Sequence, residues 1–425
     1  MSDYYRTTYS SAARKSGRSV IGIIADLIFA VITIVVALLF VITLLVPRLD
    51  PRGWGEVTTL GLVAPFIYAA QVLMTLYWVI RWRMWVAVPM ILVTMMGLFN
   101  VSSFYKMEVR RTYANPKYDR MALKVMTYNV RNFVDDRGQR NLDSMAAMIK
   151  SINPDILCFQ EFTCKTALDT LLKPMYPMPK DFNTKDLSPY IYSRYPIINA
   201  NRIDGMKEFA WADVVIRDDT MRVFSLHLHS TTIQKADKDY LENHEYIDDE
   251  ESNEQLRSML DRLTENNKLR AAQVDTISYI ISSSPYPVIV CGDFNDTPIS
   301  YTYRNMSRRM RDTYREQGRG YAHTYRGFFG LMKIDYILCS KSFDVLSYEV
   351  IDSWGWETQR TRSADTIVVR RYGNKMPLIG EGVRERLDVE TLNKIDNDSE
   401  VIDNEVNLSD HYPVMARLLY NKPTN

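Results

Sequence analysis

Polar side chains that could do chemistry stand at the ends of apolar runs in the part of the chain after residue 120. Asn129 ends the run KVMTYN, Glu161 ends ILCFQE, and His227 lies within VFSLHLH. Asp293 and Asn295 follow VIVCG in the same way. Taken alone, an Asp or Asn after a strand is normally a turn residue or a helix cap.

The same placement recurs near the C-terminus, and turns alone do not explain so many cases. Asp335 opens DYILCS, and Asp410 with His411 precedes YPVMARL. A rigid scaffold of strands can direct side chains from such positions into one cleft. The placement therefore indicates one site that is rich in carboxylates and carboxamides and has imidazoles beside them.

The elements that must position these residues are predicted as strands alternating with helices. Short β-branched runs recur from Leu123 onward, and stretches at helical spacing lie between several of them. Many runs alternate apolar with polar residues, which favours mixed or antiparallel sheets over a doubly wound parallel sheet. We therefore expect an α/β (α+β) fold, a four-layer sandwich of two packed mixed β-sheets flanked by helices.

Three long apolar runs precede this domain and predict three transmembrane helices. Residues 20–46 contain one charge, and residues 57–80 and 84–105 contain none. A bilayer core needs roughly 20 helical residues. The first run is too long for a cleaved signal peptide, and no A-x-A-like site follows it. Residues 20–105 are thus predicted to anchor the chain in a lipid bilayer.

Basic residues predict the orientation of these spans. Four precede the first run, in a tail of residues 1–19 assigned to the cytoplasm, and Arg81 and Arg83 lie between the second and third runs. Three crossings then place the remaining chain outside a bacterial inner membrane, in the periplasm. Five basic residues between Lys106 and Arg120 count against this orientation.

The remaining chain divides into a polar linker, residues 106–120, and one further domain, residues 121–425, with polar insertions at 231–268 and 355–405. The first insertion carries nine acids between Asp237 and Glu254, which form a solvated helix or loop, or a lid over the site.

Charge gives little further guidance on the partner. A net charge of +1 provides no global basic field for a polyanion. The seven arginines between Arg304 and Arg326 could bind phosphates, or could belong to a solvated amphipathic helix and loop.

The four cysteines have neither C-x-x-C spacing nor the density of a disulfide scaffold. Buried free thiols are the favoured interpretation. A Cys158–Cys164 disulfide is the alternative in an oxidising compartment.

Eight motifs occur between about Lys124 and Leu419 in this order: TYNVRNF, DILCFQE, YSRYPI, LHLH, RAAQ, GDFND, KIDYIL and SDHYPV. In these motifs the chain resembles the endonuclease/exonuclease/phosphatase superfamily of metal-dependent phosphoesterases. The resemblance implies phosphodiester hydrolysis. That reaction needs a cation on the phosphate oxygens, a deprotonated water, and donors for the charge that develops on phosphorus.

The resemblance also implies roles for the polar residues. Glu161 would be the central ligand of Mg²⁺ or Mn²⁺, with Asn129 and Asp410 completing or supporting its shell. Asp293 and Asn295 would lie on the opposite side of the phosphate, where they orient the attacking water and donate to an oxygen.

The histidines complete the implied site. His411 would bond the phosphate and act as acid, base or donor, and Asp335 would hold its imidazole. Whether Asp293 or His411 takes the proton from water stays open. His227 is the favoured catalytic histidine of LHLH, although His229 fits a related variant. Alternation along a strand would place both on the same face.

The resemblance fixes the bond that is cut and not the substrate. A nuclease-like activity on nucleic acid or nucleotides is the favoured interpretation, and a phosphoesterase of lipid headgroups or other membrane-associated phosphates is the second. A non-catalytic, membrane-bound interaction module is the third. The sequence points to no protein partner.

Overall fold

The computed structural model describes residues 20–107, 121–135, 138, 140–161, 165–176, 189–203, 206–231, 250–327, 330–352, 367–368, 384–385 and 408–422. The predicted tail and most of the predicted linker and insertions lie outside these residues. The chain divides into two compact units. We call Met1–Ile42 with Pro65–Met96 the helical unit, and Thr43–Ala64 with Gly97–Asn425 the sheet unit.

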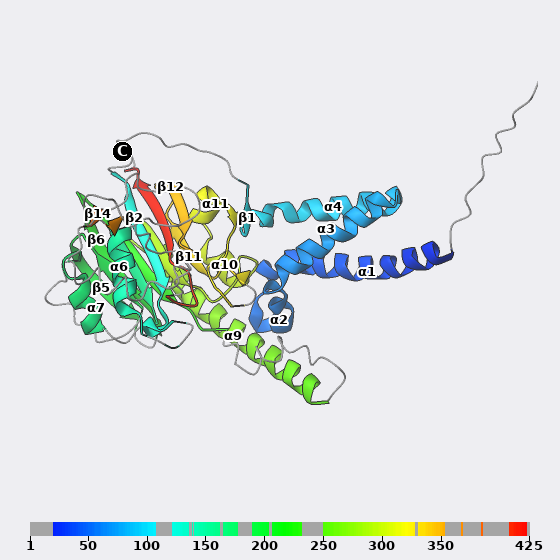
Figure 1. The fold of residues 1–425 in the computed structure, drawn as a ribbon, viewed down its shortest axis with the longest axis horizontal. Helices are drawn as coiled ribbons and strands as arrows, with labels where there is room; N and C mark the ends of the chain where they lie inside the picture. Colours follow the sequence, from blue (N-terminus) through cyan, green and yellow to red (C-terminus); the bar gives the residue numbers. More distant parts are fainter. Residues whose placement is uncertain are drawn as a thin grey trace, which may run out of the picture. The chain divides into compact units, whose positions relative to one another are not determined.

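Most of α1 (Val20–Leu45), α3 (Ala64–Ile80) and α4 (Met84–Val101) lies in the helical unit (Figure 1). Two helical stretches are long and apolar enough to cross a membrane on their own: Val20–Arg48, of 29 residues, and α4, of 18. Large apolar side chains on these helices are exposed, as at Ile21 with 78% of its surface accessible. Apolar patches of this kind mark a surface that is covered by lipid or protein.

The prediction of three uninterrupted spans is wrong. The run 57–80 is divided between α2 (Pro51–Thr58) with η2 (Thr59–Gly61) and the 17-residue α3, and the two parts are bent by 58°. Gly61 and Pro65 flank the break. Glycine weakens a helix, and proline is tolerated in its first turn but not in its interior. The described residues thus contain two independent spans, or three if the bent pair is one span.

Polar contacts join the helices of the helical unit. Asp26, the one charge in the first apolar run, forms ion pairs with Arg81 at 2.7 Å and Arg83 at 2.6 Å. Trp78 Nε1 donates to Thr33 Oγ1 at 2.7 Å. Charges within apolar helices are tolerated when they are paired in this way.

Two sheets form the body of the sheet unit. The larger contains, in spatial order, β5 (Ile197–Ile203), β6 (Met206–Ile216), β7 (Asp219–His227), β8 (Val288–Asp293), β11 (Asp335–Cys339) and β9 (Arg311–Asp312). The smaller contains β12 (Phe343–Val350), β15 (Val414–Tyr420), β2 (Leu123–Asn129), β3 (Ile156–Gln160) and β4 (Tyr190–Ser193). The pairs β7–β8 and β2–β3 are parallel and the other pairs are antiparallel. Both sheets are therefore mixed, as predicted.

Helices cover the outer face of each sheet (Figure 1). One apolar core joins α6 (Leu142–Ile152) and α7 (Lys165–Leu172) to the smaller sheet. A second joins α9 (Glu250–Ser282) and α10 (Tyr301–Met306) to the larger sheet. A third core lies between the two sheets and takes residues from both. The predicted four-layer sandwich is confirmed.

Alternation along the strands produces these layers. In β2, Val125 belongs to the core between the sheets, and its neighbour Met126 belongs to the core under α6. In β3, Cys158 and Leu157 divide in the same way. Successive side chains of a strand point to opposite faces, so a strand with a core on each side is apolar at nearly every position.

Several boundaries differ from the prediction. The expected first insertion ends inside α9, because residues 250–268 are the N-terminal part of this 33-residue helix. The third apolar run ends as helix at Val101, and Tyr105–Lys106 (β1) pairs with Gly320–Tyr321 (β10) instead of starting a linker.

The short elements not yet given are η1 (Val46–Arg48), η3 (Arg131–Phe133), α11 (Thr313–Gln317), β13 (Ile367–Val368) and β14 (Arg384–Glu385).

Three cysteines confirm the prediction of buried free thiols. Cys158, Cys291 and Cys339 are unpaired and lie in the core between the sheets. Cys164, the partner in the alternative disulfide, lies outside the described residues.

Candidate active site

The predicted polar residues gather where strands of the two sheets end. In the larger sheet Asp293, the last residue of β8, stands beside both His227 and Asp335 in strand register. In the smaller sheet Asn129 ends β2 beside the end of β3, and Glu161 follows β3 directly. Tertiary pairing thus brings together residues that are up to 206 positions apart in sequence.

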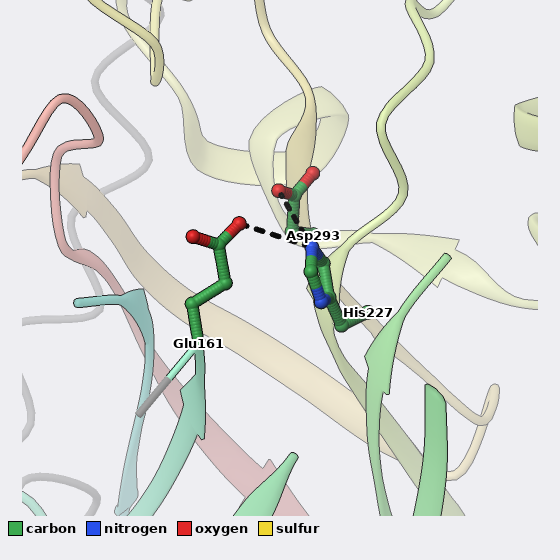
Figure 2. Close-up of side chains that lie close together, drawn as sticks. All are labelled: Glu161, His227 and Asp293. Atoms are coloured by element: carbon green, nitrogen blue, oxygen red, sulfur yellow. Dashed lines mark ion pairs between the residues drawn. The ribbon is translucent and has the colours of Figure 1, made fainter. Parts of the chain in front are cut away.

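Glu161 reaches from the smaller sheet toward His227 and Asp293 of the larger one (Figure 2). His227 Nε2 lies 3.2 Å from Glu161 Oε1 and 4.0 Å from Asp293 Oδ2. One potential ligand atom from each of the three residues lies within 4.8 Å of the other two. They form one centre at the junction of the sheets.

Asn129 connects the two carboxylates of this centre. Its Nδ2 donates to Glu161 Oε1 at 2.9 Å and to Asp293 Oδ2 at 3.1 Å. Its backbone oxygen accepts a hydrogen bond from Ser409 Oγ at 2.8 Å, which attaches the segment that carries His411. The amide nitrogen faces the carboxylates here, and a half-turn of the amide would present its oxygen to a cation instead.

His411 and Asp335 form a buried pair next to this centre. His411 Nδ1 lies 3.0 Å from Asp335 Oδ2 and 3.2 Å from Oδ1, and its Nε2 lies 3.7 Å from Asp293 Oδ2. The ring of Tyr325 packs against the imidazole, with centroids 4.9 Å apart. The carboxylate on one side and the ring on another fix the orientation of the imidazole and direct Nε2 toward Asp293.

Two predicted residues are oriented differently from the others. Asn295 donates its backbone N–H to Asp293 Oδ1 at 2.7 Å, but its side-chain amide donates to the Leu228 carbonyl at 3.0 Å. The Asp410 carboxylate lies 3.7 Å from Arg131 Nε. Among the described residues, Asp410 is in neither of the two groups whose ligand atoms converge.

Two residues of the site have an unusual backbone conformation. Glu161 and Asn295 have φ of 53° and 50°, in the left-handed region that residues with a Cβ rarely adopt. Gly292, in GDFND, has φ of 143°, and a Cβ there would lie 2.0 Å from the Leu226 carbonyl oxygen. The glycine therefore allows β8 to approach β7 closely just before Asp293.

The centre combines several carboxylates with two imidazoles, and their pKa values reflect this. Burial opposes ionisation of Glu161, but its interactions with His227 and Asn129 outweigh burial and hold its pKa at about 2. Burial raises the pKa of Asp293 to about 6. Burial disfavours the His411 cation, yet Asp335 and Asp293 raise its pKa to about 10. Burial also opposes the His227 cation, and the same kind of carboxylate attraction raises its pKa.

This donor set fits a hard divalent cation. The carboxylates of Glu161 and Asp293 both accept from the Asn129 amide and so lie close together. A positive charge between them relieves the repulsion of their negative charges. Protonated imidazoles meet that need among the protein's own groups, and a cation could replace part of their charge. Oxygen-rich sets of this kind match Mg²⁺ or Mn²⁺ better than zinc, which prefers nitrogen and sulfur.

The two histidines of LHLH have different environments. β7 ends at His227, so the expected alternation does not continue to His229. The His229 ring bonds Asn266 Oδ1 of α9 at 3.0 Å, and its backbone N–H donates to Gln273. His227 therefore faces the centre and His229 faces the helix layer. Arg270 also has a structural role, because it is fully buried and donates to the His229 carbonyl at 2.9 Å.

Sequence patterns did not identify three residues that shape the site. Ser409, Thr324 and Tyr325 hold the segments around His411 and Asp335, and Thr324 Oγ1 accepts the Asp335 backbone N–H at 3.0 Å. The position of Ser409 beside Asp410 in SDH was a usable signal. Thr324 and Tyr325 stand in a polar stretch with no distinguishing pattern.

Comparisons with known proteins identify the family of the sheet unit. The sequence profile of the Endonuclease/Exonuclease/phosphatase family matches residues 126–411, and that of a domain of unknown function matches residues 26–104. No curated protein matches the chain.

Solved structures are similar to the chain at low identity. An endonuclease/exonuclease/phosphatase family protein from Bacteroides thetaiotaomicron is 18% identical, with a TM-score of 0.45 over 71% of this chain and 98% of that chain. A mannosyl-6-phosphatase from the same organism is 18% identical, with a TM-score of 0.42 over 70% and 100%. A truncated TDP2 from Caenorhabditis elegans is 17% identical, with a TM-score of 0.41 over 71% and 98%.

Proposed function

This chain belongs to the endonuclease/exonuclease/phosphatase family, and from that premise we propose that it is a metal-dependent phosphoester hydrolase anchored in a membrane. One observation supports the proposal above all others. Glu161, His227 and Asp293 converge within 4.8 Å, and Asp293 also joins a second such group with Asp335 and His411.

Glu161 is the proposed principal metal ligand, and Asn129 and Asp410 are proposed to complete or support its shell. A bound Mg²⁺ or Mn²⁺ would neutralise charge on the phosphate oxygens and make a water molecule more acidic. Asp293 is proposed to orient the attacking water, and Asn295 is proposed to assist through its backbone N–H, which donates to Asp293 Oδ1. His227, between Glu161 and Asp293, is proposed to contact the phosphate.

The pair of Asp335 and His411 is proposed to stabilise the transition state. Asp335 accepts from Nδ1 of the imidazole at 3.0 Å, which fixes the tautomer and favours the cation. The other nitrogen can then donate to a phosphate oxygen. With a pKa of about 10, His411 holds its proton at neutral pH, whereas Asp293, at about 6, is suited to accept one from water. We therefore assign the general base to Asp293.

The apolar helices are proposed to anchor the enzyme. Residues 43–64 and 97–425 form one compact unit, and both segments are proposed to lie on the same side of the bilayer. In this proposal α3 crosses away from that side and α4 crosses back. At about 1.5 Å per residue, the 17 residues of α3 extend about 25 Å, slightly less than the bilayer core. The basic residues that precede α1 favour a periplasmic catalytic side.

Nuclease-like hydrolysis of phosphodiesters in nucleic acid or nucleotides remains the favoured reaction. One feature favours the second candidate, a phosphoesterase of lipid headgroups. The segment between the first two apolar helices is part of the sheet unit, and Gly61 bonds Thr297, two residues after Asn295. A loop of the site is thereby tied to a segment that continues directly into an apolar helix.

The full chain in detergent or in nanodiscs tests the proposal. It is assayed with Mg²⁺ and with EDTA on bis-p-nitrophenyl phosphate, plasmid DNA and phospholipid vesicles, and Glu161→Gln serves as a control for contaminating hydrolases. DNA nicking without lipid turnover supports the nuclease, and the reverse supports the lipid enzyme. Folded, metal-loaded protein that hydrolyses none of the three would refute the hydrolase. A reporter fused after Asn425 and active only in the cytoplasm would refute the orientation.

A further inference from the structure

The segment between the first two apolar helices packs as an integral part of the sheet unit. We call residues 46–63 the interspan segment; it contains η1, α2 and η2. The apolar run 57–80 predicts that residues 57–63 belong to the second span. The structure instead gives the interspan segment buried contacts with α9 and with the loop that follows Asn295.

Buried hydrogen bonds attach this segment at two points. Asn267 Nδ2 of α9 donates to Thr58 Oγ1 at 3.2 Å, and Thr297 Oγ1 donates to the Gly61 carbonyl at 2.9 Å. Thr297 lies two residues beyond Asn295. The second bond thus joins the interspan segment to the loop that carries part of the candidate active site.

The contact surface requires glycine at two positions of the segment. A Cβ on Gly55 would lie 2.4 Å from Thr264 Cγ2, and one on Gly61 would lie 2.3 Å from the backbone oxygen of Ile299. The second clash is with backbone, which cannot rotate away as a side chain can. Gly53, in the same segment, has nothing within 4 Å of such a Cβ.

Leu62 extends the contact toward the catalytic histidine. It is 8% exposed and forms an apolar cluster with Leu263, Met332 and Ile334, and Tyr325 packs against this cluster. The ring of Tyr325 lies 4.9 Å from that of His411.

The same cluster supports the partner of the histidine. Ile334 directly precedes Asp335, and the backbone N–H groups of both donate to Thr324 Oγ1 at 3.0 Å. The cluster therefore touches the supports of both members of the His411–Asp335 pair.

We propose that the interspan segment is a positioning element for catalysis, in which Gly61 holds the loop after Asn295 and Leu62 supports the Tyr325 ring that orients His411. The inference rests on the proposed hydrolase function. The segment touches no reacting atom, so its residues act through others. Because misplacement of a reacting group by about 1 Å can cost about 100-fold in rate, partial loss of this support should lower kcat and leave KM nearly unchanged.

Matched variants of the full chain in nanodiscs test this role, with Mg²⁺ and bis-p-nitrophenyl phosphate as the probe. Gly61→Ala is compared with Gly53→Ala, the same substitution in the same segment without a clash. Leu62→Ala is compared with Leu62→Met, which refills the cluster, and with Leu419→Ala. Leu419 is 7% exposed and lies near the end of β15 that is farther from His411. Leu419→Ala therefore removes a side chain as buried as Leu62 but distant from His411.

We expect Gly61→Ala and Leu62→Ala to lower kcat about tenfold with KM within about twofold. Gly53→Ala, Leu62→Met and Leu419→Ala should keep kcat within about threefold, although Leu419→Ala lowers thermal stability like Leu62→Ala. Equal kcat for Leu62→Ala and Leu419→Ala would show that Leu62 contributes to stability alone, and the proposal would be wrong.

A spectroscopic readout separates this inference from the hydrolase proposal. The chain has five histidines, so ¹³Cε1-labelled histidine gives a small set of signals, and that of His411 is identified by its loss in His411→Gln. Ring currents from Tyr325 should shift this signal, and Leu62→Ala should move it while Gly53→Ala does not. A wild-type chain without turnover would refute the hydrolase, and the signal would still report the packing. An unmoved signal in Leu62→Ala refutes the positioning role.

Discussion

Replacement of Asp335 by Asn is the sharpest test of the proposed catalytic pair, Asp335 and His411. The carboxylate lies 3.0 and 3.2 Å from Nδ1 of His411, and both side chains are nearly inaccessible to solvent. A hydrogen bond to a charged group contributes about 1.5–3 kcal/mol. At about 1.4 kcal/mol per tenfold change in rate, its loss from the transition state should lower kcat by about 10- to 150-fold.

The dependence of kcat on pH should change in a definite direction in the same variant. Burial opposes the His411 cation, and Asp335 is the first of the carboxylates that nevertheless raise its pKa to about 10. If the cation donates to the phosphate, activity persists below this pKa and is lost above it. Asp335→Asn should therefore move the basic limb to lower pH, by about one to two units if the same interaction energy is lost. A bound cation lowers the limb in both proteins, so they are compared at one Mg²⁺ concentration.

The assay is kcat against pH on bis-p-nitrophenyl phosphate, with circular dichroism as a check on folding. Asp213→Asn is the matched control. Asp213 is 2% exposed and paired with Arg222 at 2.6 Å. It lies in the interior of β6, opposite Arg222 of β7, and not at the strand ends that form the site. It should cost stability and leave both kcat and the basic limb near wild type. If Asp335→Asn gave the same kcat and the same limb as Asp213→Asn, the reasoning about the pair would be refuted.

Three further outcomes follow from the site. Glu161→Gln removes a charge from the centre, so the Mg²⁺ concentration for half-maximal activity should rise about tenfold or more. An unchanged Mg²⁺ titration would show that Glu161 is not a metal ligand. Excess EDTA should abolish turnover, with recovery on addition of Mg²⁺ or Mn²⁺; turnover that persists in EDTA contradicts metal dependence. His227→Ala should lower kcat about 100-fold, whereas His229→Ala, whose ring bonds Asn266, should stay within about threefold. Equal losses for the two histidines would contradict their assignment to different layers.

The sheets and most positions of the candidate site were predictable because both depend on local patterns. The alternation of apolar and polar residues predicted the strands and sheets. Polar residues at strand ends predicted the candidate site, because a side chain at a strand end lies at the edge of the sheet. Asn129, Glu161 and Asp293 were identified in this way and converge in the structure. Such patterns place a residue at an edge and leave open which neighbour its side chain contacts.

The structure differs from the prediction where tertiary contacts determine the orientation of a side chain. Asn295 was predicted from its position in GDFND, but its amide turns to the Leu228 carbonyl. His229 was expected on the same face as His227 because alternation was assumed to continue, yet β7 ends between them. Asp410 lies beside Arg131, and the sequence around it gives no sign of this contact. Each of these orientations depends on a partner or strand end that is set by the fold as a whole.

The interspan segment shows the same limit most clearly, and it affects how the proposed hydrolase must be studied. Thr58 and Asn267 are 209 positions apart, and Gly61 and Thr297 are 236 apart, so no local pattern predicts that they meet. From sequence, the natural soluble fragment would begin after residue 105. That fragment would lack Leu62 and expose Leu263, Met332 and Ile334 beside Tyr325. If the interspan segment supports His411 as proposed, weak activity of such a fragment is no argument against a hydrolase. The activity of this chain is best measured with its first two apolar helices, and the segment between them, still attached.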